Sequence, residues 1–162
     1  MKDILVSSDD VEANRVYQAE AGVFPETRGQ ALKSLGQVTD FLEGIFRTMW
    51  FRNRFPEVKR FKLHDGRGQR IAWAELDDDF VCHLSLPKIM REPLMILHEL
   101  AHCLTSDGHG RYFAATYLQL VHRFLGSDAS RDLRDNFVAA RVKHRLPRRK
   151  PRPTHWDELT SL

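Results

Sequence analysis

The sequence has no long hydrophobic run and only two cysteines. No apolar segment approaches the roughly 18 consecutive residues that a membrane-spanning helix needs. Residues 1–7 include too short an apolar core for a secretory signal peptide, and acidic residues follow at once. Two cysteines, Cys82 and Cys103, cannot provide a disulfide framework. These absences argue against a membrane protein and a disulfide-stabilised secreted protein, and they predict a cytoplasmic protein.

The length of 162 residues is sufficient for one domain with a hydrophobic core. The chain is 42% apolar and 29% charged, which is ordinary for a globular protein. Prolines and basic residues become frequent after residue 146. We therefore expect a single domain over residues 1–146 and a basic, proline-rich tail over residues 147–162.

Hydrophobic periodicity predicts an α+β fold. Apolar residues recur at helical spacing in most of the chain, but between residues 58 and 86 the period changes to two. Helices are expected at residues 9–22, 38–51, 92–104, 110–126 and 130–142, and strands at residues 58–64, 69–76 and 80–86. Because short connections containing Gly or Asp separate the strands, we expect an antiparallel three-stranded meander.

The segment 93–113 contains the most specific chemical pattern. It includes His98-Glu99-x-x-His102, which places two imidazoles on one face of a helix, and His109 follows on a glycine-containing turn. A catalytic zinc takes three protein ligands, with nitrogens at about 2.0–2.1 Å, and leaves one position for water. His98, His102 and His109 would complete that set for one Zn²⁺ per chain.

Glu99 follows the first predicted ligand and is the candidate catalytic base. Its carboxylate would take a proton from the attacking water, whose acidity zinc increases. The short pattern also arises by chance in chains with eight histidines, so the alternative is a histidine cluster without metal. An apolar stripe beside the motif favours the metal site, because it predicts a helix that is half core and half active site.

Four further residues near the motif have more than one interpretation. Tyr112 is either a group that stabilises an oxyanion or a packed aromatic residue, and His83 either contacts substrate or metal or is a strand histidine without such a role. Asp107 either orients a ligand histidine or only turns the chain. Cys103 is either a metal ligand or a buried free thiol, and the second is expected because its side chain points away from the metal face.

The C-terminal segment carries most of the positive charge. Seven basic residues and no acidic residue fall between positions 141 and 152: Arg141, Lys143, Arg145, Arg148, Arg149, Lys150 and Arg152. The formal charge of the chain is +3, so the remainder has a formal charge of −4. The tail either binds the phosphates of a nucleic acid or is a solvated segment without a partner.

The run His98-Glu-Leu-Ala-His102-x6-His109-Gly110-x-x-Phe113 resembles the SprT-like branch of zinc-dependent peptidases. This resemblance implies a zincin-like fold, three zinc ligands at His98, His102 and His109, and Glu99 as the base. It also implies a peptide or protein substrate that pairs with an edge strand at residues 80–86. The chain as a whole is similar to a small family of HExxH metallohydrolases from actinobacteria and their phages, whose substrates are undefined.

The motif differs from the patterns of two other zincin families. Metzincins have glycine and then histidine where this chain has Thr105 and Gly108, and gluzincins use a glutamate from a following helix as the third ligand. No Cys-x-x-Cys zinc ribbon follows the motif, although some SprT-like proteins carry one. The motif is therefore specific for the metal site and uninformative about the substrate.

Three functions are compatible with these features. The first is a zinc-dependent hydrolase, in particular a metallopeptidase that uses Glu99. The second is a zinc-stabilised module that binds nucleic acid or protein through its basic tail without catalysis. The third is an inactive relative, against which the intact Glu99 argues. The first two can be combined, since SprT-like peptidases often act on proteins bound to DNA.

Overall fold

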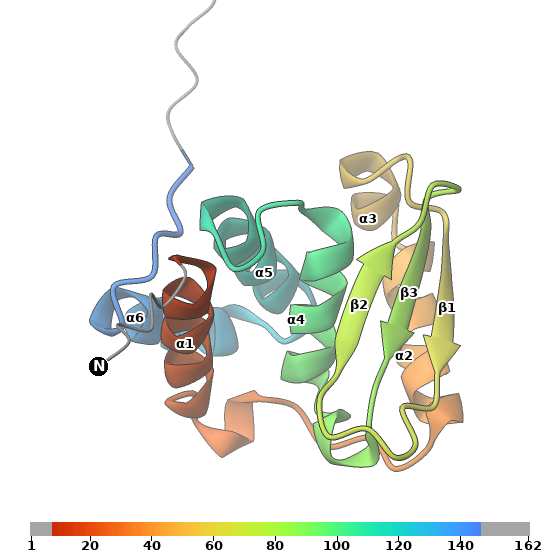
Figure 1. Ribbon diagram of the computed structural model, residues 1–162, viewed down its shortest axis with the longest axis horizontal. Helices are drawn as coiled ribbons and strands as arrows, with labels where there is room; N and C mark the ends of the chain where they lie inside the picture. The colour runs from red at the N-terminus through yellow and green to blue at the C-terminus, as the bar shows by residue number, and fades with distance from the viewer. Residues whose placement is uncertain (1–7, 147–162) are drawn as a thin grey trace, which may run out of the picture.

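The computed structural model describes residues 8–146 and shows an α+β fold (Figure 1). Six α-helices lie within this range: α1 (Ser8–Ala21), α2 (Leu35–Arg47), α3 (Met49–Arg54), α4 (Pro93–Leu104), α5 (Arg111–Phe124) and α6 (Ser127–Ala139). One sheet contains β1 (Arg60–His64), β2 (Trp73–Leu76) and β3 (Val81–Ser85), and short 3-10 helices occupy Pro25–Thr27 and Lys88–Met90. The α+β class is therefore confirmed, and the predicted tail at residues 147–162 lies outside the described residues.

The predicted antiparallel meander is wrong. The strand order is β1-β3-β2, and β1 runs parallel to β3, whereas β2 and β3 are antiparallel. β3 takes the central position because Cys82 and Leu84 are fully buried, while most residues of β1 and β2 are partly or fully exposed. The segment between β1 and β2 is longer than a tight turn and passes the end of β3 (Figure 1). Residues 80–86 therefore do not form an edge strand.

Helix α4 lies at the centre of the molecule. It packs against β2 and β3 on one side and against α5 on the other (Figure 1). Pro93 suits the first turn of this helix, where its missing N–H costs no hydrogen bond. The preceding loop approaches closely at Gly29, where φ is +84° and an added Cβ would lie 2.7 Å from Pro93 Cγ. A glycine is required at this contact.

Helix α1 is attached to the helical layer mainly through α6. The side chains of Val16, Ala19 and Val23 are buried in the core. After α1 ends, the backbone N–H of Phe24 donates a hydrogen bond of 2.7 Å to the Asp132 carboxylate of α6. With α1 held in this way, Tyr17 and Glu20 reach His98 of α4, although they are distant from it in sequence.

Two predictions from composition can be compared with the fold. Cys82 and Cys103 are buried free thiols, as expected for Cys103, and the Cys103 Sγ–H donates to the Glu75 carbonyl oxygen at 3.4 Å. Within residues 8–146, no helix is both long and apolar enough to span a membrane.

Candidate metal centre

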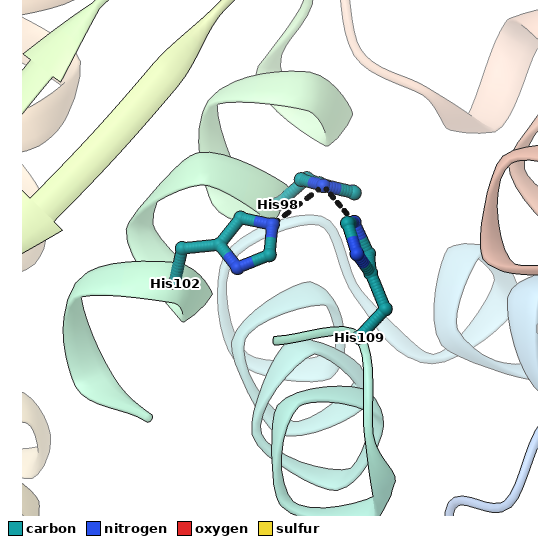
Figure 2. Close-up of side chains that lie close together, drawn as sticks. All are labelled: His98, His102 and His109. Atoms are coloured by element: carbon teal, nitrogen blue, oxygen red, sulfur yellow. Dashed lines mark hydrogen bonds between the residues drawn. The ribbon is translucent and has the colours of Figure 1, made fainter. Parts of the chain in front are cut away.

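The three predicted histidine ligands converge in the structure. His98 and His102 project from α4, and His109 approaches from the turn that precedes α5 (Figure 2). The Nε2 atom of His98 lies 3.1 Å from Nε2 of His102 and 3.3 Å from Nε2 of His109. Ligand nitrogens of the three side chains all lie within 4.8 Å of one another. The convergence inferred from the motif is confirmed.

These distances suit a single metal ion. Two nitrogens at about 2.0–2.1 Å from a tetrahedral ion are separated by about 3.3–3.4 Å. The observed separations of 3.1 and 3.3 Å need only small side-chain adjustments to reach this geometry. His98 is buried, whereas His102 and His109 are partly exposed, so a further ligand can approach from solvent. The donor set can therefore hold a metal ion with an open position.

Glu20 of α1 orients the buried histidine. Its carboxylate accepts a hydrogen bond from Nδ1 of His98, and the side chains of both residues are nearly inaccessible to solvent. Because Nδ1 carries the proton, Nε2 retains its lone pair and faces the other two histidines. A carboxylate that holds a ligand histidine in this way fixes its tautomer and increases its basicity.

Sequence reasoning missed Glu20, although its position carries a signal. Val16, Ala19, Glu20 and Val23 follow the i, i+3, i+4, i+7 pattern of one helix face, and all four are buried. A glutamate within an apolar stripe needs a partner, since an isolated buried charge is costly. The pattern could have identified Glu20 as a buried functional carboxylate, but not His98 as its partner.

The protonation states of the histidines favour metal binding at neutral pH. Burial, with the positive charges of neighbouring histidines, lowers the pKa of His102 to about 3. Burial and the charge of His98 lower the pKa of His109 to about 4. For His98, burial opposes protonation, but the charge and hydrogen bond of Glu20 outweigh it and raise the pKa. His102 and His109 are thus neutral ligands at pH 7, whereas at His98 the carboxylate of Glu20 favours the protonated imidazole, which competes with metal binding at Nε2.

Glu99 lies beside this cluster in a largely dry environment. Only 6% of its surface is exposed. Burial raises its pKa to about 7, with a further contribution from the charge of Glu20 and an opposing one from His98. A carboxylate with a pKa near 7 is well matched to accept a proton at neutral pH and return it in a later step.

Tyr17 is one of three aromatic residues packed against the histidines, together with Phe113 and Tyr117. The ring of Tyr17 stacks on His98 with centroids 5.7 Å apart and meets the edge of His109 at 5.2 Å. Partial burial and the carboxylates of Glu99 and Glu20 raise the pKa of Tyr17, so its phenol remains protonated and can donate a hydrogen bond. Tyr112 is 55% exposed, so its interpretation as a packed aromatic residue is wrong.

Asp107 shapes the turn that presents His109. Its carboxylate accepts hydrogen bonds from the backbone N–H groups of Tyr112 at 2.7 Å and Phe113 at 3.0 Å, and so caps the start of α5. Gly110 closes the turn, and a Cβ there would lie 2.5 Å from the Asp107 carboxylate. Steric crowding by Asp107 therefore explains why a glycine follows His109. Asp107 stabilises the turn instead of orienting a ligand histidine.

Replacing Asp107 by alanine is expected to destabilise the protein by about 1–2 kcal/mol, because two N–H groups of the first turn of α5 lose their acceptor. Urea unfolding of the metal-free protein would measure the loss. Asp128→Ala is a matched control, since Asp128 also lies in the first turn of a helix but is 80% exposed and forms an ion pair with Arg131. Equal losses in the two variants would contradict the capping role.

His83 belongs to a different part of the molecule. Its Nε2 lies 2.8 Å from the Asp77 carboxylate and its Nδ1 lies 3.1 Å from Nε2 of His64, on the face of the sheet opposite Cys82 and Leu84. Within residues 8–146, the only cluster able to hold a metal consists of His98, His102 and His109. The structure therefore places His83 in a separate hydrogen-bonded network and not among the metal-site histidines.

A cavity of about 560 Å³ opens beside His102. Its apolar lining comes from Phe55, Val58, Leu76 and Leu104, and it is therefore bounded by α4, the end of β2 and the segment after α3. This volume is within the range of about 300–1,000 Å³ that is usual for ligand pockets. A molecule in this cavity would lie next to His102, one of the three metal-site histidines.

Comparisons with known proteins do not assign the chain to a family. No family model matches the chain, and no match was found among curated proteins or solved structures. The resemblance to SprT-like peptidases remains a prediction that rests on the motif residues.

Proposed function

We propose that the protein is a zinc-dependent hydrolase that cleaves peptide bonds. The observation that carries the proposal is the juxtaposition of three converging imidazole nitrogens, at 3.1 and 3.3 Å, with the buried Glu99. The pKa of Glu99 is raised to about 7 by burial, as a general base requires. Metal ligands, an orienting carboxylate and a base thus occupy adjacent positions on α1, α4 and the turn before α5.

The donor set supports zinc in particular. Neutral imidazoles suit zinc, copper, nickel and iron, and three histidines with an open position are typical of catalytic zinc. A bound zinc ion would polarise the scissile carbonyl group and increase the acidity of the attacking water. Glu20 would hold His98 in the tautomer that presents Nε2, through the hydrogen bond to Nδ1.

The remaining groups have distinct tasks in this proposal. Glu99 accepts a proton from the attacking water and delivers it to the leaving nitrogen. The protonated phenol of Tyr17, beside His98 and His109, donates a hydrogen bond to the oxyanion that forms on the carbonyl oxygen. Tyr17 is therefore a candidate for oxyanion stabilisation in addition to Tyr112.

The cavity beside His102 supports a substrate with an apolar side chain. Its lining residues, which include Phe55, Val58 and Leu76, would exclude water from that side chain. A peptide with an aliphatic or aromatic residue next to the cleaved bond is therefore the preferred substrate class. The adjoining polar groups of Arg54 and Glu57 would contact the peptide at the cavity margin.

The alternative of a purely structural zinc site is less well supported. Structural zinc sites are closed by four protein ligands, whereas catalytic sites keep one position open. Among residues 8–146, three side chains can bind the same ion, and two of them are partly exposed. The basic tail of the binding-module alternative lies outside the described residues.

Metal analysis and a cleavage assay test the proposal together. Purified protein is expected to contain one zinc per chain and to cleave an unfolded protein such as casein. A zinc chelator should abolish cleavage, and added zinc should restore it. Protein that takes up no metal, or cleavage that persists without it, would contradict the proposal.

The variant His109→Ala provides the residue-level test. With two histidines left, we expect zinc content to fall well below one per chain and cleavage to disappear. His64→Ala is the matched control, because it removes an imidazole from the network with His83 and should leave zinc content unchanged.

A further inference from the structure

The free edge of β1 borders a groove with an unusual concentration of positive charge. The groove has a volume of about 780 Å³ and lies between β1 and the helices α2 and α3. Five basic side chains line it: Arg47, Arg52, Lys59, Arg60 and Lys62. Glu43 is the only acidic residue among the lining residues. This surface is distinct from the metal-site histidines and from the C-terminal tail.

The charge of this groove is not a consequence of overall composition. Without the seven basic residues between positions 141 and 152, the chain has a formal charge of −4. A cluster of basic side chains on an otherwise acidic chain produces a local positive potential that attracts anions. The groove would therefore attract a polyanion even without the tail.

Most of this charge is available to a ligand. Arg47 forms an exposed ion pair with Glu43, and Arg52 donates a hydrogen bond to the Arg47 carbonyl oxygen. Lys59, Arg60 and Lys62 are exposed, and within the described part of the chain none of them forms an ion pair. Arg60 and Lys62 lie two positions apart on one face of β1, and Lys59 directly precedes the strand, so the three cations place positive charge along this edge for the phosphates of an extended chain.

The groove also contains aromatic surface. Phe46 of α2 and Phe61 of β1 line it, with ring centroids 5.1 Å apart, and both are only partly buried. Proteins that bind single-stranded nucleic acids combine a basic groove along the backbone with aromatic side chains on which bases stack. In a duplex, the bases are already stacked on each other and cannot use such a surface.

From these observations we infer that the groove beside β1 binds a single-stranded nucleic acid. Lys59, Arg60 and Lys62 contact its phosphates, and Phe46 and Phe61 provide an apolar surface for a base. This inference does not depend on the proposed hydrolase activity. It places a nucleic-acid site on the folded domain, whereas the amino-acid composition indicated such a site only in the basic tail.

Charged residues on an edge strand have a second known role. Lysines there prevent the edge from pairing with another copy of the chain. The two roles predict different consequences of removing the charge: loss of nucleic-acid binding in one case and self-association in the other.

The test uses the full chain and the double variant Arg60→Gln/Lys62→Gln. Fluorescence anisotropy with labelled oligo(dT) of 20 nucleotides and with a 20-base-pair duplex is measured between 50 and 300 mM NaCl. Loss of two phosphate contacts should weaken oligo(dT) binding about tenfold near 150 mM salt and reduce the salt slope by about 1.4. The wild type should bind oligo(dT) more tightly than the duplex.

Arg131→Gln/Arg134→Gln is the matched control, because it removes the same charge from exposed positions of α6, at the opposite end of the molecule (Figure 1). Its affinity should stay within about twofold of the wild type. Thermal unfolding and zinc content of both double variants should be unchanged. Wild-type affinity in the β1 variant, equal losses in both variants, or equal binding of duplex would overturn the inference. Unchanged binding together with self-association on gel filtration would assign Arg60 and Lys62 to edge protection.

Discussion

Replacing Glu99 by glutamine is expected to lower peptide cleavage by about 10²- to 10⁴-fold while one zinc per chain is retained. The two side chains have nearly the same shape, so the buried site is preserved, but the amide cannot accept the proton of the attacking water. Zinc content, measured together with cleavage of casein, would distinguish this result from loss of the metal. Activity close to that of the wild type would contradict the role of Glu99.

The control for this variant is Glu26→Gln. Glu26 is exposed in the 3-10 helix Pro25–Thr27, away from the converging histidines, and its replacement removes the same charge. Its cleavage rate should remain within about twofold of the wild type. A comparable loss in both variants would indicate an effect of net charge on substrate binding instead of a missing base.

The same variant provides a second readout, in the stability of the metal-free protein. The folded state raises the pKa of Glu99 from 4.5 to about 7, so it favours the protonated carboxyl group. This contribution to the free energy of unfolding is fully present below pH 4.5 and is lost as the pH rises through 7. At pH 8 the loss is roughly 3–4 kcal/mol, because each pKa unit corresponds to about 1.4 kcal/mol.

Glutamine at position 99 does not ionise, so the variant avoids this loss. Urea unfolding of both metal-free proteins should show that Glu99→Gln gains stability relative to the wild type between pH 5 and pH 8. A difference that is independent of pH would contradict the raised pKa of Glu99. A gain in stability together with loss of cleavage is expected when a buried base is retained for function.

The second large effect is expected at Glu20. Its carboxylate accepts the Nδ1 proton of His98, and loss of such a partner usually lowers metal affinity 10- to 100-fold. Glu20→Gln retains a carbonyl acceptor but loses the charge, whereas Glu20→Ala loses both. Zinc affinity should therefore decrease in the order wild type, Glu20→Gln, Glu20→Ala, as measured by competition with a chromophoric chelator at pH 7.

Gln18→Ala is the control on the same helix, since Gln18 is exposed on α1. Its zinc affinity should equal that of the wild type. If Glu20→Ala also bound zinc with unchanged affinity, the carboxylate would have only a packing role. The zinc competition experiment does not require a substrate, so it remains informative even if the peptidase proposal is wrong.

Local patterns in the sequence were sufficient for most helices and for the histidine motif, but the single helix expected at residues 38–51 is divided at Thr48 into α2 and α3. The spacing of His98 and His102 places both side chains on one face of any α-helix, because this geometry depends only on the helical repeat. Capping residues, the motif itself and apolar stripes predicted the helices observed as α1, α4 and α5. His109 was also predictable, since Gly108 and Gly110 indicated a turn just after α4.

The tertiary structure alone decided which distant residues complete the site. Glu20 and His98 are 78 positions apart, and their contact depends on the packing of α1 against α6. The order of the strands also could not be predicted from local sequence patterns, because it depends on which strand buries the most apolar surface. β3 is central because Cys82 and Leu84 are fully buried. Hydrophobic periodicity determined what each segment forms, whereas the burial of all segments in one common core determined which of their side chains meet.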